Sequence, residues 1–378
     1  MNDTANDALE TAAPEPRANP ELMGHGEAEN MLAEAARSDR LHHAWLISGP
    51  KGIGKATLAY RLARWLLAGR AEASCQAAMF GEAAPGDSEQ GLWLSPDDPT
   101  YSRVAAGGHS DLITVERSLD DTGKRLRRDI IATDIRKVSG FLSLTAAEGG
   151  WRVVIIDGAE DMNRHAANAL LKTLEEPPSR TVLLLLSHAP GRLLATIRSR
   201  CAKLPLKTLD QTAVVHLLDR YRPDLATEDK ALLAVMGEGS IGRAIRLADA
   251  GGVALYREML HLLSAMPSPD VARLHGITDA IARSRAETGA YEAYDIFTEF
   301  LTSWIARLVR VRATGELPAD LAPGEEKILA RLSVTGSLDQ WLEVWEKITR
   351  LFGRAERVNL DRKQVLLNAF FALSRIGP

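Results

Sequence analysis

Cysteine is scarce in this sequence. Two cysteines, Cys75 and Cys201, occur among 378 residues and lie far apart along the chain. Two thiols are too few for a disulfide framework or a four-cysteine zinc site, so we expect neither a structural metal nor an oxidising environment. The sequence therefore predicts a cytoplasmic protein without a metal site.

Long apolar runs are also missing. No uncharged apolar stretch reaches 18 residues, so we predict no transmembrane helix and no membrane partner. Residues 1–20 hold acidic side chains among alanines and prolines and lack the basic start and apolar stretch of a signal peptide; we expect a disordered tail. The net charge of −4 argues against a protein that coats DNA by bulk electrostatics, but it permits a local basic face.

Strand and helix patterns alternate between residues 21 and 207. Four apolar runs are predicted as strands: Ala44–Ser48, Leu112–Glu116, Arg152–Ile156 and Thr181–Leu186. Such runs are typical of a parallel sheet that helices cover on both faces. Residues 69–110 are rich in Gly, Pro, Ala and Asp, which indicates an irregular insertion.

After residue 207 the patterns are helical. Three short helices, each opening with an N-cap residue, are predicted at Asp210–Arg220, Thr227–Met236 and Ser240–Ala250. Longer amphipathic helices are predicted at Tyr291–Arg312, Leu338–Gly353 and Asp361–Ser374. We therefore predict, after the tail, an α/β domain over 21–207, a small helical domain over 208–251 and a larger helical domain over 252–378.

A phosphate-binding loop follows the first predicted strand. Residues 49–56 read GPKGIGKA and match the pattern G-x-x-x-x-G-K, directly before a helix predicted at Ala56–Ala68. The glycines would expose backbone N–H groups to phosphate, and Lys55 would reach the β- and γ-phosphates. The glycines concerned are Gly49, Gly52 and Gly54.

Two positions that serve ATP hydrolysis are altered. Ala56 replaces the Ser or Thr that binds Mg²⁺, and Thr57 is no simple substitute because one helical residue rotates a side chain by about 100°. Asp157 ends an apolar strand, as a Mg²⁺-associated carboxylate would, or it merely caps that strand. Gly158 follows it where an active ATPase has Glu, and Glu160 lies too far along to be assumed equivalent. We predict nucleotide binding at most, without efficient turnover.

Several further segments carry a family resemblance. Residues 196–201 (TIRSRC) follow the fourth predicted strand and its polar end, Ser187, and resemble the Ser-Arg-Cys motif of clamp-loader subunits. Residues 41–44 (LHHA), 168–178 (NALLKTLEEPP) and 239–243 (GSIGR) resemble other segments of these proteins, in the same order. Over residues 21–250 the chain thus resembles the AAA+ clamp-loader subunits of bacterial DNA polymerase III. The altered phosphate loop favours the delta-prime type over the motor subunits.

This resemblance implies a mechanism and partners. Arg200 would be an arginine finger that reaches ATP and Mg²⁺ in the adjacent subunit, and Ser187 would take the polar sensor-1 position. Arg198 is the weaker rival, and a surface salt bridge is the plain alternative for Arg200. The fold would be a P-loop AAA+ domain, a helical lid and an all-α collar. The partners would be motor and delta-type subunits of a hetero-pentamer, which places a sliding clamp on primed DNA, and the chain would need no cofactor itself.

Alternatives stay open. One is an active motor subunit of the same loader, and another is a P-loop kinase acting on a small molecule. The four-cysteine zinc module of many clamp-loader subunits is not expected, because only Cys75 lies in that region. The basic run Lys124–Arg128 follows a turn predicted at Asp120–Gly123, and we interpret it as a solvated hairpin tip rather than a DNA contact.

Overall fold

The structure is a computed structural model of the chain. By its internal contacts the chain divides into two compact units, one up to Arg222 with Gly239–Gly242, the other from Pro223 to Glu238 and from Arg243 onward. The predicted three-domain division stays a prediction. The described residues are 13–71, 73, 91–120, 122–123, 125–148, 150–283, 293–318, 321–358 and 360–376.

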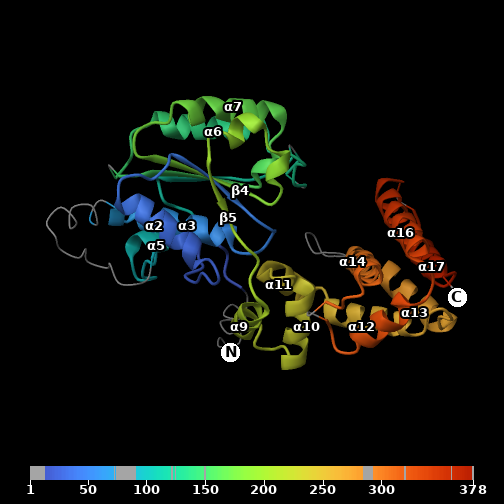
Figure 1. The fold of residues 1–378 in the computed structure, drawn as a ribbon. Coiled ribbons are helices and arrows are strands. Elements are labelled where there is room, and N and C mark those ends of the chain that lie inside the picture. The colour runs from blue at the N-terminus through green and yellow to red at the C-terminus, as the bar shows by residue number, and fades with distance from the viewer. Residues whose placement is uncertain are drawn as a thin grey trace, which may run out of the picture. The chain divides into compact units, whose positions relative to one another are not determined.

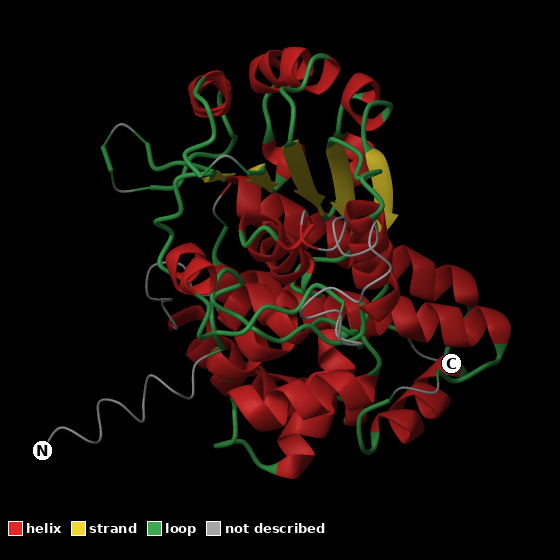
Figure 2. Ribbon diagram, turned by 90° about the vertical axis from the view of Figure 1, so that its left-hand side faces the viewer, coloured by secondary structure: helices red, strands yellow, loops and turns green. Residues whose placement is uncertain are grey.

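A five-stranded parallel sheet forms the centre of the first unit. Its order is β2-β3-β4-β1-β5, so the first strand of the chain lies between the fourth and the fifth. Figure 2 shows the strands of this sheet side by side. The strands are β1 Ala44–Ser48, β2 Leu112–Val115, β3 Arg152–Asp157, β4 Thr181–Ser187 and β5 Ala202–Pro205. The four predicted strands are confirmed, and β5 was missed.

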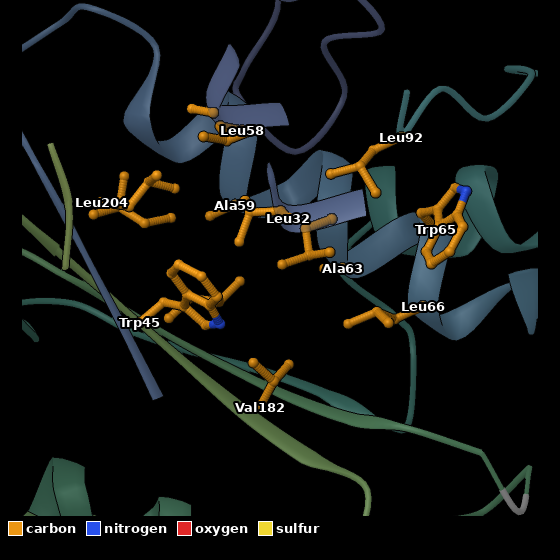
Figure 3. Close-up of a cluster of buried hydrophobic side chains, with 14 of the residues drawn as sticks. Leu32, Trp45, Leu58, Ala59, Ala63, Trp65, Leu66, Leu92, Val182 and Leu204 are labelled. Atoms are coloured by element: carbon orange, nitrogen blue, oxygen red, sulfur yellow. The ribbon is translucent and has the colours of Figure 1, made fainter. Parts of the chain in front are cut away.

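Helices cover both faces of the sheet, which explains the apolar runs. Successive strand residues point to opposite faces. Trp45 packs with α2 and α3 in one cluster (Figure 3), whereas Leu46 packs with α6 and α7 in another. Figure 1 shows these helix pairs on opposite sides. The helices of this unit are α2 Gly26–Arg37, α3 Lys55–Leu67, α5 Pro99–Ala105, α6 Ala132–Ser143, α7 Arg164–Glu175, α8 Ala195–Arg198 and α9 Gln211–Tyr221.

Part of the predicted disordered tail is ordered. Residues 1–12 lie outside the described residues, but the carbonyl oxygens of Asn19 and Pro20 accept hydrogen bonds from Arg64 and Arg61 at 2.8 and 2.6 Å. Both arginines are buried on α3, so they need carbonyl partners in place of water. For residues 13–20 the prediction of disorder is therefore wrong.

At the predicted turn, Asp120 and Gly123 are joined by a hydrogen bond, and the described residues on either side form no extended strand. The Gly123 N–H donates to the Asp120 carbonyl at 2.9 Å, as a β-turn requires. The flanking segments share a single antiparallel bridge, between Leu119 and Leu126. Asp121 and Lys124 lie outside the described residues, as does Cys75 in the predicted insertion.

The second unit is helical. Its long helix α14 buries Phe297 and Trp304, and Phe300 meets Tyr256 of α12 edge-on at 5.1 Å between ring centroids. Its helices are α10 Thr227–Gly237, α11 Ile241–Asp249, α12 Gly252–Ser264, α13 Val271–Arg283, α14 Ala293–Thr314, α15 Glu325–Ser333, α16 Leu338–Val358 and α17 Arg362–Leu373. The first two residues of α11 are counted with the first unit. The helical character predicted after residue 207 is confirmed.

One of the predicted N-caps, at α9, is confirmed, and another, at α10, is wrong. The Asp210 carboxylate accepts from the Ala213 N–H at 2.7 Å, as an N-cap should. At α10 the N-cap is Ala226, one residue before the predicted Thr227, and no side chain caps the helix. Within the described residues no helix combines the length and apolarity needed to cross a membrane. In that same part of the chain, no three His, Cys, Asp or Glu side chains are grouped for a metal.

Candidate functional site: a phosphate loop and a surface arginine

The loop between β1 and α3 has the shape of a phosphate-binding loop. Gly52 and Gly54 have φ of 80° and 110°, values that favour glycine, and they let the chain turn tightly into α3. The Lys55 ammonium donates to the carbonyls of Gly49 and Pro50 at 2.8 and 2.7 Å, which draws the loop around its Nζ. The backbone N–H groups of residues 51–54 have no hydrogen-bond acceptor within the described chain. They are free to bind an anion.

Neighbouring segments hold the outer side of this loop. The buried His25 ring bonds the Ile53 carbonyl at 2.7 Å. Ser240 Oγ donates to the Lys51 carbonyl at 2.7 Å, and the Gly242 N–H donates to the Gly52 carbonyl at 2.9 Å. A Cβ atom on Gly242 would lie 2.8 Å from Gly52 Cα, so only glycine permits this approach. These hydrogen bonds engage the loop carbonyls on its outer side and hold the loop in this shape.

Position 56, where a phosphate loop usually has the Mg²⁺-binding hydroxyl, faces an open pocket. Ala56 and Asp157 line one open pocket of about 550 Å³, whereas the Thr57 side chain is buried. The walls of the pocket withdraw water from the Asp157 carboxyl and raise its pKa, although its tip stays accessible, and Lys55 opposes this rise. Burial lowers the pKa of Lys55, against the attraction of Asp157 and Glu160. The site thus keeps the charges of a nucleotide site without the hydroxyl that binds Mg²⁺.

Glu160 returns to the site by a turn that the sequence pattern did not reveal. Gly158 has φ of 75° and begins the 3₁₀ turn Ala159–Asp161, which carries Glu160 back to the end of β4. Burial would raise the pKa of Glu160, but hydrogen bonds from its own backbone and that of His188 lower it overall. Its Oε1 also pairs with Nδ1 of His188. Setting Glu160 aside by spacing alone therefore missed a buried carboxylate near Lys55.

Ser187, for which the sensor-1 role stays a prediction, is the last residue of β4. It lies beside Ser48, the last residue of β1, and is 1% exposed. Its Oγ accepts from the Ala189 N–H at 3.2 Å, and its carbonyl accepts from the Gly49 N–H at 3.1 Å. The residue thus fastens the start of the phosphate loop to β4.

The residues of the Ser-Arg-Cys segment point in different directions. Arg200 lies at the surface, where its guanidinium donates to the Thr196 carbonyl at 3.0 Å and pairs with Glu175 at 2.8 Å. Both partners of this ion pair are well exposed, at 37% and 50%, so the pair is worth only about 0–1 kcal/mol. Arg198 differs, because its Nε is buried and has no hydrogen-bond partner in the described part of the chain. Of the two arginines, Arg200 is therefore the one that can exchange its ion-pair partner for an anion of another molecule at a small cost in free energy.

Cys201 points inward, and its thiol should react slowly. Burial raises its pKa to about 11, so the thiolate fraction at pH 8 is about 0.001, roughly 100 times below that of an ordinary protein thiol of pKa near 9. We expect iodoacetamide to alkylate Cys201 at least about 100-fold more slowly in the folded chain than in urea. Peptide-resolved mass spectrometry on a Cys75→Ala background measures this. Equal rates in both states would contradict the buried position.

Known proteins are similar to this chain over the residues that form the site. Residues 24–210 match the model described as "DNA polymerase III, delta subunit". DNA polymerase III subunit delta' of Pseudomonas aeruginosa is 39% identical over 209 residues, which are 55% of this chain and 56% of that protein. The delta' subunit of Escherichia coli K12 is 35% identical over 219 residues, 57% of each chain. Over these residues the chain is similar to delta-prime-type subunits of bacterial DNA polymerase III.

The chain is also similar to other subunits of DNA polymerase III. DNA polymerase III subunit tau of Escherichia coli is 31% identical over 235 residues, 61% of this chain and 32% of that protein. The chain thus spans about half the length of the delta' relatives and a third of tau. A gamma subunit-related protein from Thermotoga maritima covers 93% of this chain and 100% of its own, with 17% identity and a TM-score of 0.39.

The segment at residues 239–243 that resembles other clamp-loader subunits ends in an arginine that already has two ion-pair partners. Arg243 pairs with Glu238 at 2.8 Å and with Glu299 at 2.9 Å, and its side chain is 19% exposed. Two carboxylates hold a guanidinium firmly, because each bond is charge-assisted. In this structure Arg243 therefore serves the packing of the second unit.

Proposed function

We propose that this chain is the delta-prime-type subunit of a bacterial clamp loader and that it supplies Arg200 in trans to ATP bound by an adjacent subunit. The observation that carries the proposal is the contrast between two sites of one chain. Arg200 lies at the surface and is held by an exposed ion pair with Glu175 and a hydrogen bond to the Thr196 carbonyl, while the chain's own loop has Ala56 and Gly158 where hydrolysis needs a hydroxyl and a carboxylate.

Arg200 suits the task by its chemistry. A guanidinium is permanently charged and planar and can bond two oxygens of a transferring phosphoryl group. The adjacent subunit would provide ATP, Mg²⁺ and the attacking water, and Arg200 would leave Glu175 to neutralise the charge that develops during phosphoryl transfer. Because the Glu175 pair is exposed, its loss costs little compared with the gain at a buried phosphate.

The chain's own loop would have a different role. Its free N–H groups at residues 51–54 and Lys55 fit a phosphate group, so nucleotide binding is compatible with the loop. Thr57 is buried, Asp157 has no neighbouring catalytic Glu, and Glu160 is engaged by His188. We infer that the loop and Ser187 are kept as a rigid scaffold without turnover.

The partners follow from the same proposal. Motor and delta-type subunits would join this chain in a hetero-pentamer that opens a sliding clamp and closes it on primed DNA. Residues 21–207 would be the AAA+ domain, residues 208–251 the lid and residues 252–378 the collar that holds the subunits together. The helical second unit supplies the apolar core that such a collar needs.

The similarity to tau makes a motor subunit the second candidate, and turnover separates the two. We expect the isolated chain to hydrolyse ATP at background rate, and Lys55→Ala to leave the clamp- and DNA-stimulated ATPase of a reconstituted loader within about twofold of normal. A motor would show turnover alone and lose about 10²-fold or more with Lys55→Ala, since that lysine contacts the phosphates directly. Lys203→Ala, which changes an exposed lysine of β5, controls for folding. Loss with Lys55→Ala but not with Lys203→Ala would contradict the proposal.

A further inference from the structure

An open groove lies between the last two helices of the chain. Helices α16 (Leu338–Val358) and α17 (Arg362–Leu373) lie side by side (Figure 1). The groove between them has a volume of about 460 Å³ and is lined by residues of both helices and by Arg375 just beyond α17. All of these residues belong to the second unit.

The groove is strongly basic. Lys347, Arg350 and Arg354 follow one another at helical spacing along one face of α16, and Arg375 joins them from the other side. Arg350 has an exposed ion pair with Glu346 at 3.6 Å. In the part of the chain that the structure describes, Lys347, Arg354 and Arg375 have no ion-pair partner, and the lining includes no carboxylate. Four like charges around one hollow repel each other unless an anion enters.

The groove also has an apolar part. Phe371 is 40% exposed, although its neighbours Phe370 and Ala372 are buried. Its ring and the half-buried Leu351 face the same groove as the cations. An aromatic ring that stays partly exposed to water contributes less burial free energy to folding. A concave basic surface that contains such a ring is a typical binding site for a ligand with both acidic and apolar groups.

We propose that this groove binds a short acidic peptide segment of a partner protein that also carries an apolar side chain. The carboxylates would pair with the four cations, and the apolar side chain would cover Phe371 and Leu351. A single-stranded nucleic acid fits less well, because such sites stack successive bases on several aromatic rings and this groove offers one. The inference concerns other residues than Arg200 and the phosphate loop and goes beyond the proposed clamp-loader role.

Fluorescence anisotropy with a defined probe tests the proposal. The probe is a fluorescein-labelled peptide of five aspartates followed by leucine and phenylalanine, added to the full-length chain and to the reconstituted loader. We expect saturable binding to both. The double variant Arg354→Glu/Arg375→Glu should weaken binding at least about tenfold, and Phe371→Ser about fivefold. Arg310→Glu on α14, an exposed arginine without an ion-pair partner among the described residues, should change it less than about twofold.

Several outcomes would overturn the inference. Equal affinity for a peptide with serines in place of leucine and phenylalanine would reduce the groove to an unspecific basic surface. Tighter binding of a 15-nucleotide oligothymidylate, lost in Arg354→Glu/Arg375→Glu, would make it a nucleic-acid site. Binding to the lone chain but not to the loader would show that a neighbouring subunit covers the groove. Because these variants leave Arg200 intact, ATPase rates report separately on the proposed function.

Discussion

Replacing Arg200 with alanine is expected to slow ATP hydrolysis at the adjoining site of a reconstituted loader by about 10³-fold or more. The effect should be this large because the guanidinium acts on charge that exists only in the transition state, so its loss is not offset by tighter substrate binding. The measurement is single-turnover hydrolysis in the presence of clamp and primed DNA, in a loader whose other motor sites carry inactivating changes of the phosphate-loop lysine.

Matched variants make this prediction sharp. Arg200→Lys keeps the charge but not the planar pair of donors and should recover only a small part of the rate. Arg192→Ala removes another exposed arginine nearby and should leave the rate within about twofold. Glu175→Ala removes the ion-pair partner of Arg200 and should also have a small effect. A large loss for Arg198→Ala with normal rates for Arg200→Ala would show that Arg198, and not Arg200, is the arginine finger.

Replacing Arg307 with methionine is expected to lower the free energy of unfolding of the chain by about 3 kcal/mol. The reason lies in Glu325, whose side chain has no exposed surface. Its Oε1 pairs with Arg307, and its Oε2 accepts from the Ala322 N–H at 2.9 Å. Burial lowers the pKa of Arg307, but Glu325 and Tyr256 raise it overall, as expected for a cation that its surroundings favour. Without Arg307, a carboxylate is left buried with one backbone donor.

Urea unfolding of the full-length chain measures this effect. The double variant Arg307→Met/Glu325→Leu should be considerably more stable than Arg307→Met alone, because an apolar pair leaves no unpaired buried charge. Arg310→Met, three residues along α14 on an exposed position, is the matched control and should change stability by less than about 0.5 kcal/mol. If Arg307→Met and Arg310→Met behaved alike, the buried ion pair would contribute nothing.

The sequence allowed much of the sheet to be predicted. The runs Ala44–Ser48 and Thr181–Ser187 are apolar on both faces because helices cover both sides, and few other structures need such runs. The strand-loop-helix order around Lys55 was likewise recognisable, since its glycines and lysine are tied to phosphate chemistry. β5 escaped because it is an edge strand that holds Lys203 and ends in Pro205, residues that a central strand would exclude.

Parts of the site depended on long-range contacts that no local pattern encodes. The return of Glu160 to β4 depends on the left-handed Gly158, and the closeness of Gly242 to Gly52 joins segments 190 residues apart (242 − 52). The pairing of Arg243 with Glu299 also arises only in the folded unit. A signal for Glu160 did exist, because glycine directly after Asp157 permits a turn that a residue with a Cβ atom disfavours.

The place of β1 in the sheet also sets an order of events during synthesis. The ribosome makes this strand early, yet both of its neighbours, β4 and β5, come late in the chain. After Ser48 has been made, another 139 residues must be added before its partner in β4, Ser187, is present (187 − 48). At about 5–20 residues per second this takes roughly 7–28 s, during which Trp45, Leu46 and Ile47 have no strand to pair with. The nascent chain therefore offers an apolar strand edge to chaperones, or to other nascent chains, for longer than the finished protein takes to close its sheet.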